Sequence, residues 1–517
     1  MATTEQSPPA QAEQRQHYGI TFAVLAFGTL SYTLLQSLVL PALPTLQASL
    51  HTSESSVAWV LTAYLLSASI ATPILGRLGD MYGKEKMLLV VFGGIVVGAI
   101  LGGLATSMST MIVARVIQGT GGAIFPLSFG IIRDEFPEDR VSGGIGLLST
   151  IIGVGGGGGI ILGGPIIQHL SYHWLFWIPA VLSLFALVAA WRFIPESPVR
   201  APGRINYLAA ALLSGWLTAL LVAVSMGSIW GWTSARVLGL LGAAAVLGVL
   251  WARTETRTDH PLIDMRMMRI PTVWWTNVAA LLFGVGMYSS IVLIPPYLQT
   301  AASHGYGFGA SPTMSGLFMA PNAGAMLVTG FLIGTLTERF GSKRLLVVGG
   351  AMGAVSFAML MLSSVAEWEF LVANLVSGLG VGLAFASMSN LVVDAVPDTQ
   401  TGAATGMNAN IRTIGGAVGS AIVASILASQ TVGGVPTLHS YTLSFGVLAL
   451  AFLLATAAAA VVPVYRWSAG AELVASEPVA SDPAATGAGA GAHLAATAGA
   501  VAGEVVAPDP LPGTVVT

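Results

Sequence analysis

The sequence predicts an all-α integral membrane protein with fourteen membrane-spanning helices. Of its 517 residues, 54% are hydrophobic and 8% are charged, and the mean hydropathy is +0.79. So few charges could not cover a soluble protein of this length, whereas a bilayer supplies an apolar solvent for most of the outside. Apolar stretches of about 18 to 25 residues, the length that crosses a bilayer, recur along the chain. They predict helices at 18–40, 55–76, 87–106, 109–131, 143–166, 172–193, 206–227, 235–252, 271–295, 311–334, 345–364, 367–390, 403–428 and 440–463.

Lysine and arginine are concentrated in every second loop between the predicted helices. Cytoplasmic loops of membrane proteins hold an excess of these residues, so the alternation predicts an inner or plasma membrane protein with both termini cytoplasmic. Arg236 is the exception on the other side. The basic residues of the expected cytoplasmic loops are Arg77, Lys84, Lys86, Arg133, Arg140, Arg192, Arg200, Arg204, Arg253, Arg257, Arg266, Arg269, Arg339, Lys343 and Arg344.

The two halves of the chain repeat each other. The segment GRLGDMYGK at 76–84 is echoed by GTLTERFGSK at 334–343, and ARVIQGTG at 114–121 is echoed by ANLVSGLG at 373–380. Because the echoed loops fall on the same side of the membrane, they indicate parallel copies of a six-helix unit, an arrangement found in alternating-access transporters.

The predicted organisation therefore has five parts. The residues after Arg466 are rich in Ala, Gly, Pro and Val without periodicity, which predicts a disordered tail, with a helical partner-binding segment as the alternative. The parts are a cytoplasmic N-terminal tail at 1–16, an N-terminal six-helix bundle at 17–200, two inserted helices with linkers at 201–270, a C-terminal six-helix bundle at 271–466, and a cytoplasmic tail at 467–517.

Three motifs carry a resemblance to a known family. They are Gly76-x-Leu78-x-Asp80-x-x-Gly83-Lys84 after helix 2, Arg115-x-x-Gln118-Gly119-x-Gly121-Gly122 in helix 4, and Gly155-x-x-x-Gly159-Ile160-x-x-Gly163-Gly164 in helix 5. With these motifs, residues 15–465 resemble the major facilitator superfamily, and within it the fourteen-helix branch of drug:proton antiporters. The resemblance implies the major facilitator fold, with two six-helix bundles plus two inserted helices around a central cavity.

The first motif and its echo are expected to form a gating loop. Their glycines allow tight turns, and Asp80 would meet the positive N-terminal end of helix 13 near Arg133 or Arg412. The resemblance implies an inner gate that locks the outward-open state, and a charged loop that merely orients the helices is the alternative. The expected gating residues are Gly76, Asp80, Gly83, Lys84, Gly334, Glu338, Arg339 and Gly341.

Arg115 lies within predicted helix 4. An arginine inside a bilayer costs roughly 2.5 to 3.5 kcal/mol even on the lenient insertion scale, so we expect it to face the central cavity, with Gln118 one turn further on. The resemblance implies a part in proton coupling. The alternative is a structural arginine whose donors are satisfied by carbonyl groups of helix 1 or 2.

Five consecutive glycines in the third motif raise three alternatives: a phosphate loop, a linker, or a closely packed helix. No Gly-Lys-Ser/Thr follows and the flanking residues are apolar, which disfavours the first two. In lipid a glycine-rich helix keeps its backbone hydrogen bonds, and small residues four apart let two helices meet closely. The resemblance places Gly155, Gly159, Gly163 and Gly164 against helix 10, with Ile160 where the family has a proline.

No Asp or Glu lies near the middle of any predicted span, although many relatives have an acid in helix 1. Proton coupling needs a titratable carboxylate, so Asp134 and Glu135 are the candidates, with solvated boundary charges as the alternative. Without a deep carboxylate, the cavity should accept neutral or anionic amphiphiles as readily as cationic dyes. Its expected polar lining is Tyr32, Gln36, Arg115, Gln118, Asn277, Tyr288, Asn374 and Asn390.

The implied function is export of amphipathic small molecules in exchange for protons, by a monomer in the bilayer that needs no cofactor, metal or nucleic acid. No nucleotide-binding motif is present, so the energy would come from a gradient. A dedicated exporter of one endogenous metabolite or lipid shares every motif. An integral-membrane enzyme is disfavoured, because such enzymes cluster His, Asp or Glu at one face and the eight histidines here are scattered.

Overall fold

The computed structural model describes residues 18–57, 59–196, 206–258, 261–432 and 435–463. Within these residues, fourteen helical segments are long and apolar enough to cross a membrane. Each overlaps one of the predicted ranges, so the all-α class and the number of spans are confirmed. The predicted tails at 1–16 and 467–517 lie outside the described residues.

The first six spans come from the N-terminal half of the chain. Short helices α2 (Leu43–Ser49) and α3 (Glu54–Val57) link the first two spans. The spans are α1 (Tyr18–Ser37) with η1 (Leu40–Ala42), α4 (Trp59–Tyr82), α5 (Lys84–Gly103), the segmented α6 (Met108–Gly119), η2 (Thr120–Ala123) and α7 (Ile124–Glu135), α8 (Glu138–His169), and α9 (Trp174–Phe193).

The last six spans come from the C-terminal half. A short antiparallel hairpin of β1 (Thr431–Val432) and β2 (Val435–Pro436) precedes the final span. The spans are α13 (Pro271–Gln299), α14 (Pro312–Leu317) with α15 (Ala320–Phe340), α16 (Ser342–Leu362), α17 (Glu367–Ala395), α18 (Thr401–Ser429) and α19 (Leu438–Val461), with single turns η3 (Ala302–His304) and η4 (Asp398–Gln400) between them.

The inserted helices are α10 (Tyr207–Trp230) and α11 (Ala235–Arg257), followed by the short α12 (Met265–Met268). Asn206 and Ser234 cap α10 and α11, because each side chain accepts a hydrogen bond from a backbone N–H in the first turn. Leu213 and Leu217 of α10 lie in one buried cluster with Ile414 of α18. The insert therefore covers the line along which α4 and α18 meet.

The echoed turns of the two halves share one backbone geometry. Gly83 is the single residue between α4 and α5, and Gly341 is the single residue between α15 and α16. Their φ angles are 115° and 77°, a region that favours glycine over residues with a Cβ. We call the end of the bundle that carries these turns the basic end, since the Lys- and Arg-rich loops lie there.

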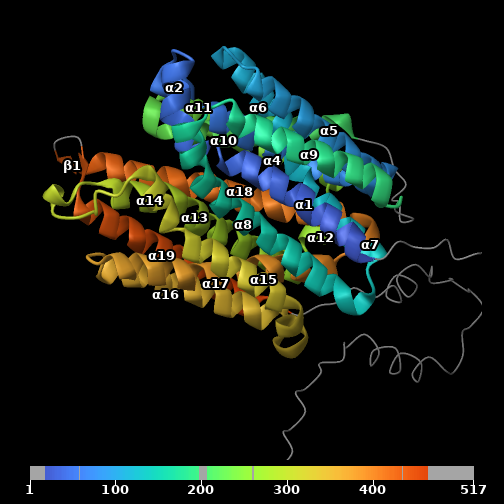
Figure 1. The fold of residues 1–517 in the computed structure, drawn as a ribbon. Helices are drawn as coiled ribbons and strands as arrows, with labels where there is room; N and C mark the ends of the chain where they lie inside the picture. The colour runs from blue at the N-terminus through green and yellow to red at the C-terminus, as the bar shows by residue number, and fades with distance from the viewer. Residues whose placement is uncertain (1–17, 58, 197–205, 259–260, 433–434, 464–517) are drawn as a thin grey trace, which may run out of the picture. The chain divides into compact units, whose positions relative to one another are not determined.

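Each half buries a hydrophobic core of its own. One cluster takes its buried members from 24–194 together with Val393, and another takes them from 279–462. The clusters follow the two repeats, while the exact domain boundaries stay a prediction. The halves meet where α4 packs on α18 and where α8 packs on α14 and α15, and Figure 1 shows α8 between the two groups of helices.

Candidate functional site

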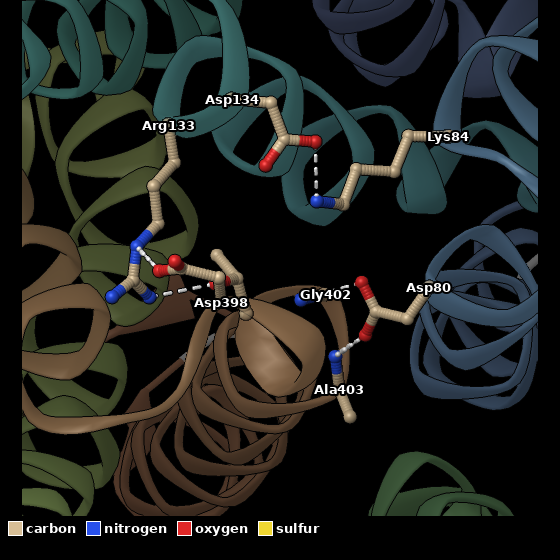
Figure 2. A network of polar contacts seen from close by, with 8 residues as sticks. Asp80, Lys84, Arg133, Asp134, Asp398, Gly402 and Ala403 are labelled. Atoms are coloured by element: carbon tan, nitrogen blue, oxygen red, sulfur yellow. Dashed lines mark hydrogen bonds and ion pairs between the residues drawn. The ribbon is translucent and has the colours of Figure 1, made fainter. Parts of the chain in front are cut away.

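The end of α4 is joined to the start of α18 at the basic end. The carboxylate of Asp80 is buried, and its two oxygens accept hydrogen bonds from the backbone N–H groups of Gly402 at 3.3 Å and Ala403 at 3.2 Å (Figure 2). The first N–H groups of a helix lack partners within the helix and carry partial positive charge, so a carboxylate there is stabilised. The contact that the sequence predicts between Asp80 and this helix is present.

Glycines permit this close approach. A Cβ on Gly76 would lie 2.8 Å from the carbonyl oxygen of Gly402, and a Cβ on Gly402 would lie 2.9 Å from the Asp80 carboxylate. Atoms do not approach a real Cβ this closely, so a side chain at either position would push α4 and α18 apart.

A second contact between the halves lies beside the first. Arg133, at the end of α7, makes an ion pair with Asp398 at 2.6 Å and donates to the Thr401 hydroxyl at 2.8 Å (Figure 2). Of the two arginines expected near Asp80, Arg133 is therefore in place. Arg412 lies elsewhere, deep in α18.

Lys84 and Asp134 form a buried ion pair within the first half. Their charged groups are 2.6 Å apart, and each side chain is 1% exposed (Figure 2). Asp134 is therefore not a solvated boundary charge, which removes that alternative for this residue. Its neighbour Glu135 is only partly buried.

The repeat of the gating loop in the second half, at 334–343, has the same glycine turn as the first half but has no buried acid among its described residues. Glu338 and Arg339 are exposed, where Asp80 is buried. Gly334 instead packs its backbone against Gly143 of α8, since a Cβ on Gly334 would lie 3.3 Å from the Gly143 Cα. Among the predicted gating residues, Gly76 and Asp80 therefore contact α18, whereas Gly334 contacts α8.

A polar pocket lies between the halves, midway along the helices. It is small, about 40 Å³, which is room for one or two water molecules. Tyr32, Gln36 and Tyr288 line it, as the sequence predicts. The sequence prediction missed six further polar residues of its lining, which are Tyr64, Ser69, Thr72, Asn410, Arg412 and Thr413.

The other predicted lining residues do not line this pocket. Asparagine and glutamine amides inside a helix bundle readily pair with neighbouring helices, and three of these four side chains do so, while Asn374 bonds to a carbonyl of its own helix. Gln118 donates to the Gly98 carbonyl at 2.7 Å, Asn277 accepts from Asn408 at 2.8 Å, Asn374 donates to the Phe370 carbonyl at 2.9 Å, and Asn390 donates to the Ser142 carbonyl at 3.2 Å.

Arg115 is fully buried behind Tyr64 and does not line the pocket either. Its Nε donates to the Val60 carbonyl of α4 at 2.9 Å, and one terminal nitrogen donates to Gln118 at 2.8 Å. Its guanidinium lies 4.3 Å from the centre of the Tyr64 ring. Backbone carbonyl groups of helices 1 and 2 thus accept from part of this guanidinium, as the structural alternative expects, while its second terminal nitrogen has no hydrogen-bond partner among the described residues.

The glycines of α8 use two faces of the helix, which corrects the predicted contact. Gly155, Gly159 and Gly163 face α1 and η1 of their own half, where a Cβ would collide with Thr33, Ser37 and Pro41 respectively. Of the four glycines predicted to make the contact, Gly164 alone faces the helix-10 segment, at Thr313. The predicted contact with helix 10 exists, but Gly143, Gly153, Gly157 and Gly164 make it, against Gly334, Met326, Ala323 and Thr313.

A larger cavity of about 560 Å³ lies at the basic end of this contact. Gly143, Gly144, Gly330 and Gly334 contribute to its walls. Phe22 and Phe331 are among its aromatic walls. In the part of the chain that the structure describes, no group of three or more His, Asp or Glu side chains could hold a metal ion.

Two helical halves enclose a polar pocket, and contacts between them lie at the basic end. The sequence model of the Major Facilitator Superfamily matches residues 25–420 and, in a second match, residues 276–503. The chain belongs to this superfamily, whose members are transporters.

Proteins similar in sequence carry names that refer to drug export. The chain is 29% identical over 419 residues to the tetracenomycin C resistance and export protein of Streptomyces glaucescens, covering 79% of this chain and 76% of the relative. It is 27% identical over 408 residues to multidrug resistance protein 3 of Bacillus subtilis, covering 78% of each.

Solved structures share the fold. A human organic anion transporter matches with a TM-score of 0.60 at 16% identity, over 87% of this chain and 100% of that one. A proton:xylose symporter matches with a TM-score of 0.61 at 14% identity, over 85% of this chain and 94% of that one.

Proposed function

We propose that this protein exports amphipathic small molecules from the cytoplasm by alternating access, in exchange for protons. The names of the two relatives described above support drug export. The Lys- and Arg-rich loops support a cytoplasmic position for the basic end.

The observation that carries the proposal is the double link at the basic end. Asp80 is bonded to the start of α18, and Arg133 is paired with Asp398. Both links cross from the first half to the second on the cytoplasmic side of the pocket. Cytoplasmic substrate reaches the pocket only after both links break, so their breaking and re-forming is the gating step.

Protons act, in this proposal, through Asp134 and Glu135, with Arg115 as a positioning residue for the pocket wall. Protonation of Asp134 removes the charge that compensates buried Lys84. The loss of that pair loosens the end of α7, which also carries Arg133. A proton that enters from outside therefore favours opening at the basic end, as an exporter driven by proton entry requires.

The test is transport by purified protein in proteoliposomes with an imposed pH gradient. We expect dye transport to require the gradient and Asp134→Asn to uncouple it, leaving downhill dye movement. The matched control is Asp139→Asn, because the Asp139 side chain is 71% exposed. Equal transport with and without a gradient would refute proton exchange.

A dedicated exporter of one compound is the second candidate. The relative from Streptomyces glaucescens is named for a single compound, and the pocket of about 40 Å³ is small. Expression in a strain without its own pumps, followed by assays with several unrelated dyes, separates the candidates. Protection against one compound alone favours the specialist.

We further propose that the protein works as a monomer in the inner or plasma membrane with both termini in the cytoplasm. A fluorescent protein fused to the C-terminus should fold and fluoresce if that end is cytoplasmic. An alkaline phosphatase fusion at the same place should be inactive, and the opposite pair of results would reverse the orientation.

A further inference from the structure

The central pocket holds a buried cation, Arg412, that has no acidic partner among the residues the structure describes. Arg412 of α18 is 6% exposed, and its Nε has no hydrogen-bond partner among the described residues. Its guanidinium lies 4.0 Å from the centre of the Phe385 ring. Arg115 is a useful contrast, because its Nε donates to a carbonyl and it stands outside the pocket.

Other unsatisfied polar atoms line the same pocket. Both side-chain polar atoms of Asn410 and the hydroxyl of Ser69 are buried and, within the described residues, lack hydrogen-bond partners. Buried polar groups in proteins are nearly always paired. Three unpaired groups around one small space indicate that a polar group of a ligand binds among them.

The positive charge of the pocket indicates that the polar group of the ligand is negatively charged. Tyr288 interacts with Arg412, and Arg115 stacks on the far side of Tyr64, so two guanidinium groups flank the tyrosines. The residues described as lining the pocket include no Asp or Glu. A cation in a low-dielectric site needs an anion for compensation, and arginine binds carboxylate and similar oxyanions with paired hydrogen bonds.

We propose that Arg412 binds an oxyanion of the substrate, so that the pocket selects aromatic amphiphiles with a carboxylate or acidic phenol over cationic ones. This inference rests on the proposed export function and specifies its substrate class. The rings of Tyr32, Tyr64 and Tyr288 provide the faces against which an aromatic body packs. The pocket widens when the halves separate, since its present volume holds only water.

The test compares two xanthene dyes with related ring systems and opposite charge, fluorescein as the anion and rhodamine 6G as the cation. Binding is measured on the full-length protein in detergent from the rise in unfolding temperature with each dye. Transport is measured separately in inside-out vesicles. The variants are Arg412→Gln, Arg412→Lys and, as a matched control at an exposed arginine, Arg236→Gln.

We expect the unmodified protein to bind fluorescein more tightly than rhodamine 6G. Arg412→Gln should weaken fluorescein binding about tenfold or more, as the loss of a charged hydrogen bond predicts, without weakening rhodamine 6G binding. Arg412→Lys should retain part of the affinity, and Arg236→Gln should change nothing.

Three results would overturn the assignment: equal weakening of both dyes, unchanged fluorescein binding in Arg412→Gln, or no binding of either dye by the unmodified protein, which would mean that water alone fills the pocket. If fluorescein binds in an Arg412-dependent manner but is not transported, the proposed export function fails and the assignment of Arg412 stands.

Discussion

The two contacts between the halves differ in the residues that form them. At the charged seam, where α4 and α7 meet η4 and α18, the buried Asp80 carboxylate and an ion pair between partly buried Arg133 and exposed Asp398 join the halves at the basic end. Where α8 meets α14 and α15, the glycine seam, small residues pack along the length of the helices. Hydrogen bonds and ion pairs break at defined geometry, whereas small residues allow close helices to pivot. The difference suggests a latch on one side and a hinge surface on the other.

The largest effect should come from the ion pair that supports the charged seam. Asp134→Ala leaves Lys84 buried and unpaired, so we expect the free energy of unfolding to fall by about 3 to 5 kcal/mol. Thermal unfolding in detergent measures it. The double variant Lys84→Met with Asp134→Leu should recover most of the loss, and a double variant as unstable as the single one would show that the charge is not the cause.

The stability of the glycine seam should depend on the volume of the side chains in it. Gly330→Ala places a methyl group against Thr150 across the seam, and overpacking of this kind costs about 1 to 3 kcal/mol. Gly324→Ala is the matched control on the same helix, because no atom lies within 4 Å of its Cβ position. Unfolding temperatures and dye transport should fall for the first variant only; equal behaviour of both would mean that the seam is loosely packed.

The latch itself should respond to the charge of Asp80. Asp80→Asn weakens the attraction to the start of α18 by about 1 to 2 kcal/mol, which raises the open population about five- to thirtyfold. The chain has no cysteine, so Ala409→Cys introduces a single reporter in the pocket wall. An impermeant maleimide added to inside-out vesicles should label it faster in Asp80→Asn. Unchanged labelling would leave the loop as a mere helix-orienting element.

The smallest effect on the free energy of unfolding should come from an exposed ion pair of the same length as the buried one. Lys86 and Glu196 are 2.6 Å apart, as Lys84 and Asp134 are, but their side chains are 55% and 42% exposed. Exposed pairs contribute little, so Lys86→Met should change the free energy of unfolding by less than about 0.5 kcal/mol. A loss as large as that of Asp134→Ala would refute the claim that burial makes the difference.

The fold was readable from the sequence because each span is a continuous apolar stretch bounded by polar loops. The contact of Asp80 with helix 13 was also predictable, since a repeated motif placed it and a helix start attracts a carboxylate. The structure confirms the spans and shows this contact.

The rotation of the helices was not predictable in the same way. Gly155 to Gly159 are identical residues in a row, so no hydrophobic pattern indicates which face meets α1 and which meets α15. The prediction that amide side chains line the pocket was wrong for a related reason. An inward-facing amide such as Gln118 pairs with a neighbouring helix as readily as it lines a pocket.

Arg412 could have been found. It lies ten residues beyond Gly402, about 15 Å along a helix, and therefore deep in the span. The argument that singles out Arg115 applies to it equally, since an arginine at that depth must face the interior of the bundle. Which of the two arginines has its Nε bonded to a carbonyl group depends on contacts that only the folded helices provide.

The most direct test of the latch and the hinge measures both ends of the bundle at once. Pairs of spin labels at equivalent exposed positions of the repeats, Val90 with Val348 near the basic end and Leu104 with Leu362 at the other, report distances between the halves. The Asp80→Asn protein should show a longer Val90 to Val348 distance and a shorter Leu104 to Leu362 distance than the unmodified protein. Distances that change in the same direction at both ends, or at neither, would contradict the account.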